Sequence, residues 1–487
     1  MQTLSVFLIV KNEEKFIKNS IEHLLPIAEQ IVIVDTGSTD NTLNILKNYN
    51  VDVFNFEWCD NFSKARNFAL SKCNKDLILY IDADEKLTDK SIQEINEIKK
   101  SKNLAKTAYL CKVKSFSADK NIFTNQMSYP RLFNRSENIY FEGAIHEQIL
   151  PSLIKNKYVI LNSTVEIIHY GYDIDEKLLQ KKAKRNLNIL LKNPEDNWYY
   201  HFQLAQTYSI LKNEDYAFFH MNKAIEYQDI PNDYLSHAAR YIADYYLNNL
   251  NFNQAYNFIA KGLAANPSQP LLNLVAANYY AKINDFDKFY KHLTIAYVNN
   301  NLYLTDYCTS SFEIFLNPFK IIFFALNIAY NFRNSEVLEE FILELKKIET
   351  ELADTIIKIL NNKEIDDKSA SLIISKFDPD TKDFFCNILQ NYKHHNIAKN
   401  ILLEIFQKQT DDTIILNALG NIFTALNDFK NAIVYFQKSM DIEPKLSTAL
   451  YLASIFIKIS DSENYKKILS YIRSNNSEIA NKLPNYI

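Results

Sequence analysis

The stretch DLILYIDADE, residues 76–85, decides the class of fold. Its continuous apolar run predicts a buried β-strand. Asp82 and Asp84 follow the run directly, one residue apart, so both carboxylates can face one ion from the turn at the strand's end. Hard carboxylate oxygens suit Mg²⁺ or Mn²⁺, and such an ion can bridge a diphosphate. Taken alone, the same pattern is also typical of a solvated acidic turn.

Similar apolar runs recur through the first third of the chain and alternate with helical patterns. Strands are predicted at residues 4–10, 30–35, 52–56, 76–81, 108–116, 129–133 and 164–169, and helices at 14–25, 41–48 and 63–71. This alternation indicates a mostly parallel sheet covered by helices on both faces. The predicted fold class is therefore α/β over residues 1–175, followed by an all-α region.

The remainder of the chain shows helical patterns with a repeat. Pro194, Pro231 and Pro267 stand 37 and 36 residues apart, and the segment from Leu419 to Pro444 matches a tetratricopeptide-like unit, whose usual period is about 34 residues. We therefore expect tetratricopeptide-like repeats at 176–300, an irregular helical region at 301–400 and further repeats at 401–487. Stacked repeats leave a concave surface. Its partner is predicted to be a peptide or protein acceptor or, alternatively, a second copy of the chain in a homodimer.

Composition excludes several classes of protein. The 487 residues are 47% hydrophobic and 23% charged with a net charge of −4, so no broad basic surface is available for nucleic acid. The apolar run at 312–330 is interrupted by polar residues, which argues against a transmembrane segment. Five scattered cysteines without CxxC spacing indicate reduced thiols in a cytoplasmic protein. The abundance of Asn, Ile and Lys is typical of an AT-rich bacterial genome.

Three further motifs accompany the acidic pair. In VDTGSTDNT, residues 34–42, Asp35 ends a strand at the carboxyl edge of the sheet, where open α/β sheets bind their ligands. The following residues, 38–40, can cap the next helix. KNEE, residues 11–14, follows the first strand, and Arg66 lies on the predicted helix of SKARNFAL. The alternative interpretation of these motifs is a capped turn and a surface arginine.

In this order, NEE, DTGSTD, ARNFAL and DADE resemble the family-two glycosyltransferases of the GT-A fold. The resemblance covers about residues 1–175. The segment at 131–149, which contains RLFNR and YFEGAIHEQI, is similar to the branch that includes lipopolysaccharide-core glucosyltransferases and the S-glycosyltransferases of glycosylated bacteriocins. The resemblance implies a metal-dependent, inverting transfer of a sugar from a UDP- or GDP-linked donor.

The resemblance also implies roles for individual residues. Glu13 and Asp35 are expected to contact the ribose and base, Arg66 and Asp82 to hold the nucleotide diphosphate, and Asp82, Asp84 and His169 to bind Mn²⁺ or Mg²⁺. The alternative for His169 is a strand-end histidine bonded to backbone. The chain departs from the family in two places. It has Asp35-Thr36 where two acidic residues are usual, and His146-Glu147 where the family often has Glu-Asp.

The pair at 146–147 is the candidate general base. Gly143 lets the backbone turn just before it, and one group must accept the acceptor's proton as the acceptor attacks the anomeric carbon. We favour Glu147, because a carboxylate matches the family's usual base, with His146 as the second candidate. A helix cap or a core pair is the structural alternative.

Three rival functions remain to be weighed. A nucleotidyltransferase would usually carry a glycine-rich, basic loop after the first strand, whereas KNEEKF contains no glycine. A non-catalytic repeat scaffold with a vestigial transferase domain predicts the loss of acidic motifs, yet Asp35, Asp82 and Asp84 are all present. The third rival concerns only the acceptor. The repeats favour a polypeptide side chain, and the alternative is a cell-envelope saccharide or lipid.

Overall fold

The structure is a computed structural model that describes residues 1–101, 106–117, 122–170, 176–305 and 316–484. The chain forms two compact units, Met1–Leu316 and Asn317–Ile487, which are described separately. Cys308 lies outside the described residues, and the predicted domain boundary falls beside such a gap. The four described cysteines are free.

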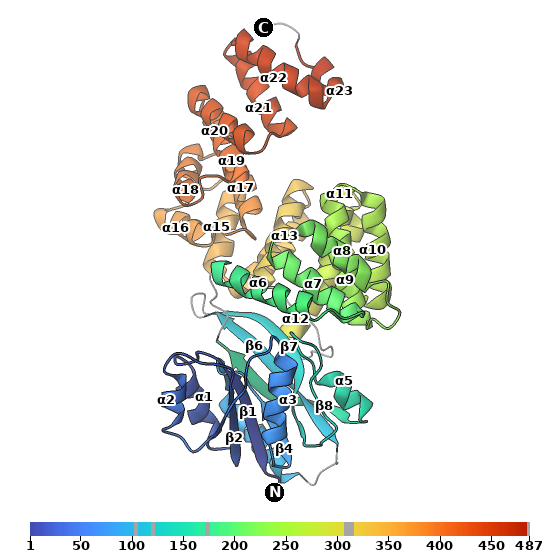
Figure 1. Cartoon of the computed structure of the whole chain (residues 1–487). Helices are drawn as coiled ribbons and strands as arrows, with labels where there is room; N and C mark the ends of the chain where they lie inside the picture. The colour runs from blue at the N-terminus through green and yellow to red at the C-terminus, as the bar shows by residue number, and fades with distance from the viewer. Residues whose placement is uncertain (102–105, 118–121, 171–175, 306–315, 485–487) are drawn as a thin grey trace. The chain divides into compact units, whose positions relative to one another are not determined.

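The first unit begins with an eight-stranded sheet (Figure 1). Its strands are β1 Leu4–Val10, β2 Gln30–Asp35, β3 Asp52–Asn55, β4 Leu77–Tyr80, β5 Glu85–Leu87, β6 Thr107–Ser117, β7 Ile122–Asn134 and β8 Val159–His169. Their order in the sheet is β3-β2-β1-β4-β7-β6-β8-β5. The first four strands in this order are parallel, whereas β7 is antiparallel to β4 and β6, and β5 is antiparallel to β8. The predicted α/β class is confirmed, and the sheet is mixed.

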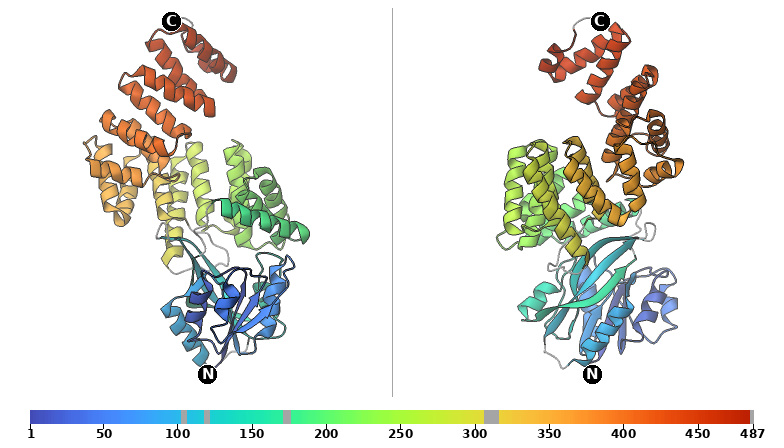
Figure 2. Two further views of the ribbon diagram at one scale, coloured as in Figure 1. Left: turned by 60° about the vertical axis from the view of Figure 1, so that its left-hand side comes forward. Right: turned by 180° about the vertical axis from the view of Figure 1, so that it is seen from behind.

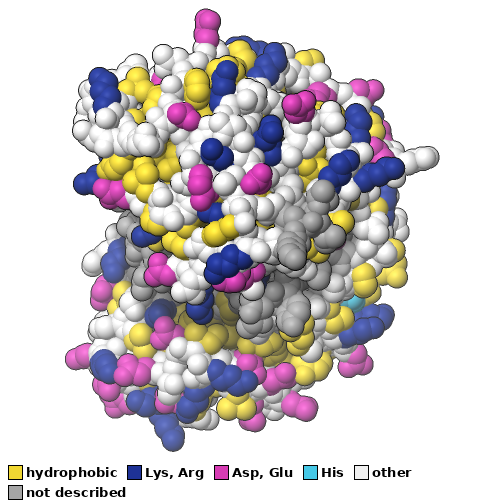
Figure 3. All heavy atoms as spheres, turned by 90° about the horizontal axis from the view of Figure 1, so that it is seen from below, with side chains coloured by type: hydrophobic (Ala, Val, Ile, Leu, Met, Phe, Trp, Pro, Cys, Tyr) yellow, Lys and Arg dark blue, Asp and Glu magenta, His cyan; other side chains and the backbone are white. Residues whose placement is uncertain are grey.

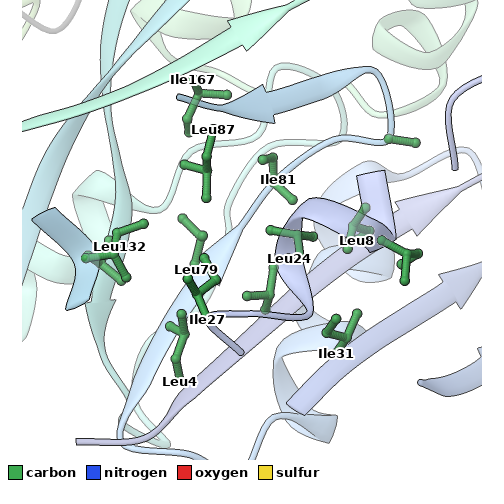
Figure 4. Packing of buried hydrophobic residues seen from close by; sticks show 14 of the residues in the cluster. Leu4, Leu8, Leu24, Ile27, Ile31, Leu79, Ile81, Leu87, Leu132 and Ile167 are labelled. Carbon is green, nitrogen blue, oxygen red and sulfur yellow. The ribbon is translucent and has the colours of Figure 1, made fainter. Parts of the chain in front are cut away.

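Both faces of the sheet are covered by helices, which explains why the central strands are apolar throughout. One face packs against α1 Ile17–Leu24, α2 Thr42–Leu46 and α4 Asp89–Lys100. Figure 4 shows Leu4, Leu8 and Leu79 from the sheet beside Leu24 from α1. The other face packs against α3 Phe62–Lys72 and α5 Leu150–Lys155.

The parallel register brings the ends of three strands to one edge. Val10 of β1 is paired with Asp35 of β2, and Phe7 of β1 with Tyr80 of β4. The chain therefore leaves β1, β2 and β4 at the same edge of the sheet, which is the edge where α/β sheets bind ligands. His169 reaches this region because it is paired with Glu85, just after the acidic turn.

The helical region of the first unit consists of antiparallel helical hairpins (Figure 2). Its helices are α6 Glu176–Lys192, α7 Trp198–Ile210, α8 Glu214–Ala224, α9 Asn232–Asn248, α10 Phe252–Ala265, α11 Pro270–Lys282 and α12 Phe286–Thr305. The α7–α8, α9–α10 and α11–α12 turns each have one residue in the left-handed region, followed by an Asn or Asp directly before the next helix. In the α9–α10 turn, Leu250 has a φ of 58° and the side chain of Asn251 accepts from Gln254 N.

The second unit is helical throughout its described part. Its helices are α13 Pro318–Asn331, α14 Ser335–Ile348, α15 Thr350–Leu360, α16 Asp367–Ser375, α17 Lys382–Gln390, α18 His395–Lys408, α19 Thr413–Ala425, α20 Phe429–Ile442, α21 Leu446–Lys458, α22 Ser462–Asn475 and α23 Ser477–Asn481. In the α19–α20 hairpin, a Cβ added at Gly420 would lie 2.6 Å from the Phe436 ring. The close packing of the Phe436 ring against α19 therefore favours glycine there.

Within the described residues, no helix is long and apolar enough to cross a membrane. On the face drawn in Figure 3, acidic and basic side chains are interspersed, and no large patch of a single sign is visible. This distribution agrees with the small net charge of the chain.

Candidate active site

Arg66 joins two of the predicted site residues at the carboxyl edge of the sheet. The side chain projects from α3 and is almost completely buried. Its Nη2 donates to Asp82 Oδ1 at 2.9 Å, and its Nε donates to Glu147 Oε1. Burial opposes the ionisation of Asp82, but Arg66 and Arg131 outweigh it and hold the pKa of Asp82 at about 2. The residues that sequence assigned to the diphosphate and to the base are therefore physically linked.

A second buried arginine, Arg131 of β7, was not assigned a role from sequence. Its Nη2 donates to Glu85 Oε1 at 2.9 Å, and its guanidinium lies over the Tyr80 ring, 4.5 Å from the ring centroid. The other oxygen of Glu85 accepts from Asp82 N at 2.8 Å, which fixes the acidic turn. Burial raises the pKa of Glu85, and the charge of Asp82 adds to this effect. In the sequence, the sign of a special role for Arg131 was its charged side chain next to apolar Leu132 within a strand.

Asp84 and His169 form a separate pair. Asp84 Oδ2 lies 3.1 Å from His169 Nε2, and each side chain is about a quarter exposed. Burial lowers the pKa of His169, but the bond to Asp84 and the surrounding carboxylates outweigh burial and raise it. The pair offers one oxygen and one nitrogen to a cation, and Asp82 is close in sequence. Among the described residues, no group of three or more His, Cys, Asp or Glu side chains is already arranged as a metal cage.

Glu13 lies on a loop that is fixed by the loop after β2. Asn12 N donates to Ser38 Oγ at 2.9 Å, and Glu13 N donates to Thr42 Oγ1 at 2.8 Å. These bonds hold the backbone, while burial and the charges of Asp84 and Asp82 raise the pKa of the Glu13 carboxyl to about 7. Electrostatic interaction with Lys182 of α6 opposes this rise. The Glu13 carboxyl therefore belongs to the same acidic site.

Asp35 is placed at the same edge, but its carboxylate is used by its own turn. Oδ2 accepts from Gly37 N at 3.0 Å and from Ser38 N at 3.1 Å, and the residue is buried. Gly37 has a φ of 104°, which favours glycine. Asp40 Oδ1 accepts from Thr42 N, the first residue of α2, whereas Ser38 Oγ accepts from Asn12 N. Asp35 thus has a structural role, and its contact with the nucleotide stays a prediction.

The loop at residues 143–147 carries Glu147 and His146 and is closed at its base. Glu142 and Gln148 exchange two backbone hydrogen bonds of 2.9 Å. Gly143 has a φ of 89°, so the turn favours glycine. Asn67, the neighbour of Arg66 on α3, bonds both backbone groups of Phe141 through its side-chain amide. Asn67 thereby holds the segment that leads into the loop, a role that sequence did not reveal.

The helical region packs directly against this loop. Ala144 and Ile145 are buried with Ile189 and Leu190 of α6 and Leu204 of α7. Lys192 Nζ also donates to Asp60 Oδ2 at 2.6 Å, in the loop before α3. The first helices after residue 175 therefore form part of the same hydrophobic core as the site.

The structure brings together six of the eight sequence-predicted residues through contacts or charge: Glu13, Arg66, Asp82, Asp84, Glu147 and His169. His146 lies beside Glu147 in the loop, with its side chain more exposed, and Asp35 bonds its own turn. The fold and this cluster define a catalytic domain of the GT-A type.

Residues 5–151 match the model of the family described as Glycosyl transferase family 2. The chain is 25% identical over 233 residues to the SPbeta prophage-derived glycosyltransferase SunS of Bacillus subtilis (strain 168), covering 46% of this chain and 53% of the relative. It is 30% identical over 190 residues to an uncharacterized glycosyltransferase of Rickettsia prowazekii (strain Madrid E), covering 37% and 64%. The chain thus spans about half to two thirds of the length of these relatives. Among solved structures, Staphylococcus aureus TarS 1–349 aligns over 63% of this chain and 92% of its own, with 17% identity and a TM-score of 0.30.

Proposed function

We propose that this chain is a metal-dependent, inverting glycosyltransferase that moves a hexose from a UDP- or GDP-sugar to a peptide or protein side chain. The observation that carries the proposal is the link from Asp82 through Arg66 to Glu147. One arginine joins the carboxylate on the leaving-group side to the carboxylate on the acceptor side. The match of residues 5–151 to the family model supports the same reaction.

In this reaction the acceptor's oxygen, nitrogen or sulfur attacks the anomeric carbon from the face opposite the nucleotide. The bond to the nucleoside diphosphate breaks, and that group leaves with the bonding electron pair. Glu147 accepts the acceptor's proton, with His146 as the alternative, and Arg66 holds the Glu147 carboxylate in place. Glu13 and the turn of Asp35 are assigned to the nucleoside.

The chemistry of two facing side chains supports a divalent cation at this site. Asp84 and His169 approach one another with a carboxylate oxygen and an imidazole nitrogen, and the side chain of Asp82 is 35% exposed. We assign Mn²⁺ or Mg²⁺ to these three residues. Such a cation, when bound, would neutralise charge on the departing diphosphate. The four free cysteines described above support a cytoplasmic site of action.

Donor hydrolysis and transfer by the purified full chain test the proposal. Wild-type protein is incubated with UDP- and GDP-hexoses and Mn²⁺ or Mg²⁺, and release of nucleoside diphosphate is followed with and without a chelator. Peptide and lipid-linked saccharide acceptors are offered in parallel, which separates the two acceptor classes. No turnover of any donor by a folded, nucleotide-binding protein would favour a non-catalytic scaffold. Full activity after chelation would show that the reaction needs no metal.

A further inference from the structure

The loop that carries Glu147 is held on one side by a tyrosine from the helical region. The hydroxyl of Tyr199, on α7, donates to the backbone oxygen of His146 at 2.8 Å. His146 has a φ of 53°, in the left-handed region that residues with a side chain rarely adopt. The Tyr199 hydroxyl therefore bonds the backbone carbonyl of the residue that has this unusual conformation.

A second tyrosine bonds the residue on the other side of Glu147. Gln148 Nε2 donates to Tyr234 Oη at 3.3 Å, and Tyr234, on α9, is 7% exposed. The rings of Tyr199 and Tyr234 meet edge to face with centroids 6.1 Å apart, and Trp198 lies 4.7 Å from Tyr234. Both hydroxyls thus come from one aromatic cluster shared by α7 and α9.

From the catalytic domain, the loop is held by different groups. Phe62 N, at the start of α3, donates to Ala144 O at 2.8 Å. Arg66, one turn farther along the same helix, bonds the Glu147 carboxylate. The backbone around Glu147 therefore lies between α3 on one side and α7 with α9 on the other.

We propose that Tyr199 and Tyr234 are positioning residues, through which the first helical repeats set the orientation of Glu147 toward Arg66 and the acceptor. The two hydroxyls bond His146 and Gln148, on either side of Glu147, so the tyrosines act on the transfer step and leave donor affinity unchanged. This inference rests on the proposed function. It adds that the helical region takes part in catalysis, independently of any acceptor that it binds.

The test uses the full chain with Tyr199→Phe and Tyr234→Phe, which remove one oxygen each and keep the aromatic cluster. Tyr227→Phe is the matched control, since its hydroxyl bonds Asp196 within the helical region. We expect kcat for transfer to fall about tenfold in each variant, with unchanged Kd for the nucleoside diphosphate and unchanged melting temperature. Amide hydrogen exchange at residues 144–148 should become faster. The control should match wild type in every measurement.

Two variants and two measurements keep the inference distinct from the proposed function. Wild-type turnover in both variants overturns it, whether or not exchange changes, because the hydroxyls then serve packing alone. If the wild-type chain transfers no sugar, the proposed function fails, and unchanged exchange at residues 144–148 overturns the positioning role as well. If Tyr199→Phe does not fold, Tyr234→Phe decides by the same criteria.

Discussion

Asp82 and Glu147 are 65 residues apart in the chain, yet both accept hydrogen bonds from the same guanidinium, that of Arg66. In the proposed reaction, Asp82 lies on the side of the leaving nucleotide and Glu147 on the side of the acceptor. A change at Arg66 should therefore disturb departure of the nucleotide and attack of the acceptor together.

Arg66→Lys should lower kcat by about 10²-fold, because one ammonium group cannot reproduce the forked bonds of Nε and Nη2. Steady-state transfer assays measure the loss, and Arg185→Lys on α6 serves as a conservative control. A lysine variant with wild-type turnover would show that the bridge between Asp82 and Glu147 is dispensable.

Glu147→Gln should lower the transfer rate by about 10²–10⁴-fold and keep donor affinity, because glutamine can still accept from Arg66 but cannot take a proton. Single-turnover kinetics and calorimetry with the nucleoside diphosphate separate the two quantities. His146→Ala is the comparison. If His146→Ala lowers the transfer rate and Glu147→Gln does not, the base is His146.

His169→Ala should raise the Mn²⁺ concentration for half-maximal activity about tenfold or more, because Asp84 loses its neighbouring ligand. Titration of the ion at saturating donor measures this, and calorimetry gives the affinity for Mn²⁺ directly. His292→Ala, in the helical region, is the control. An unchanged metal requirement would return His169 to a purely structural role.

Glu13→Gln should stabilise the protein in the absence of ligand at pH 8 and have little effect at pH 5. The folded-state pKa of Glu13 is raised from 4.5 to about 7, so its contribution to stability falls as pH rises through this window. After allowance for partial exposure, we expect a gain of about 1–2 kcal/mol at pH 8. Thermal unfolding at both pH values measures the gain.

Glu14→Gln is the matched control for Glu13→Gln, because Glu14 is the adjacent carboxylate and bonds Asn41 N instead of facing the acidic cluster. It should show no gain at pH 8. Glu13→Gln should also weaken nucleotide binding. Equal melting temperatures at pH 8 for wild type and Glu13→Gln would contradict the raised pKa of Glu13.

A chain that ends at Leu316 should fold and bind nucleotide, whereas one that ends at residue 175 should bind it poorly or aggregate. The shorter chain loses Ile189, Leu190 and Leu204, which cover Ala144 and Ile145. Calorimetry and size-exclusion chromatography compare the two. A monomeric 1–175 chain with full nucleotide affinity would show that this core is not needed for the donor site.

Three strands of the parallel half, β1, β2 and β4, were predictable because they are buried on both faces. β1 and β2 have the bounds that their apolar runs predict. β7 and β8 extend well beyond the predicted 129–133 and 164–169. The first half of β8 is largely exposed, and the polar residues Asn162, Ser163 and Thr164 interrupt its apolar side chains. Such a strand lacks the continuous apolar run that marks one buried on both faces.

The acidic part of the site was predictable because Asp82 and Asp84 are separated by one residue in the sequence, directly after an apolar strand. Arg131, Tyr199 and Tyr234 were missed because their roles depend on β7 pairing and on helix packing across distant parts of the chain. A similar limit applies to residues 301–400, where sequence shows no reliable period. There the structure has the α13–α14 hairpin, with Arg333 left-handed and Asn334 capping the next helix, as in the earlier turns.

The attachment of the catalytic loop to the helical region has a consequence for how this chain can diversify. Among the described helices after residue 175, those that bond the loop and its flanking residue Gln148 are α7 and α9. Later hairpins are stacked units that contact mainly their neighbours. We expect duplications and deletions of whole hairpins to accumulate after α9 during evolution, so that lineages vary in repeat number while inheriting an unchanged pair of anchoring tyrosines.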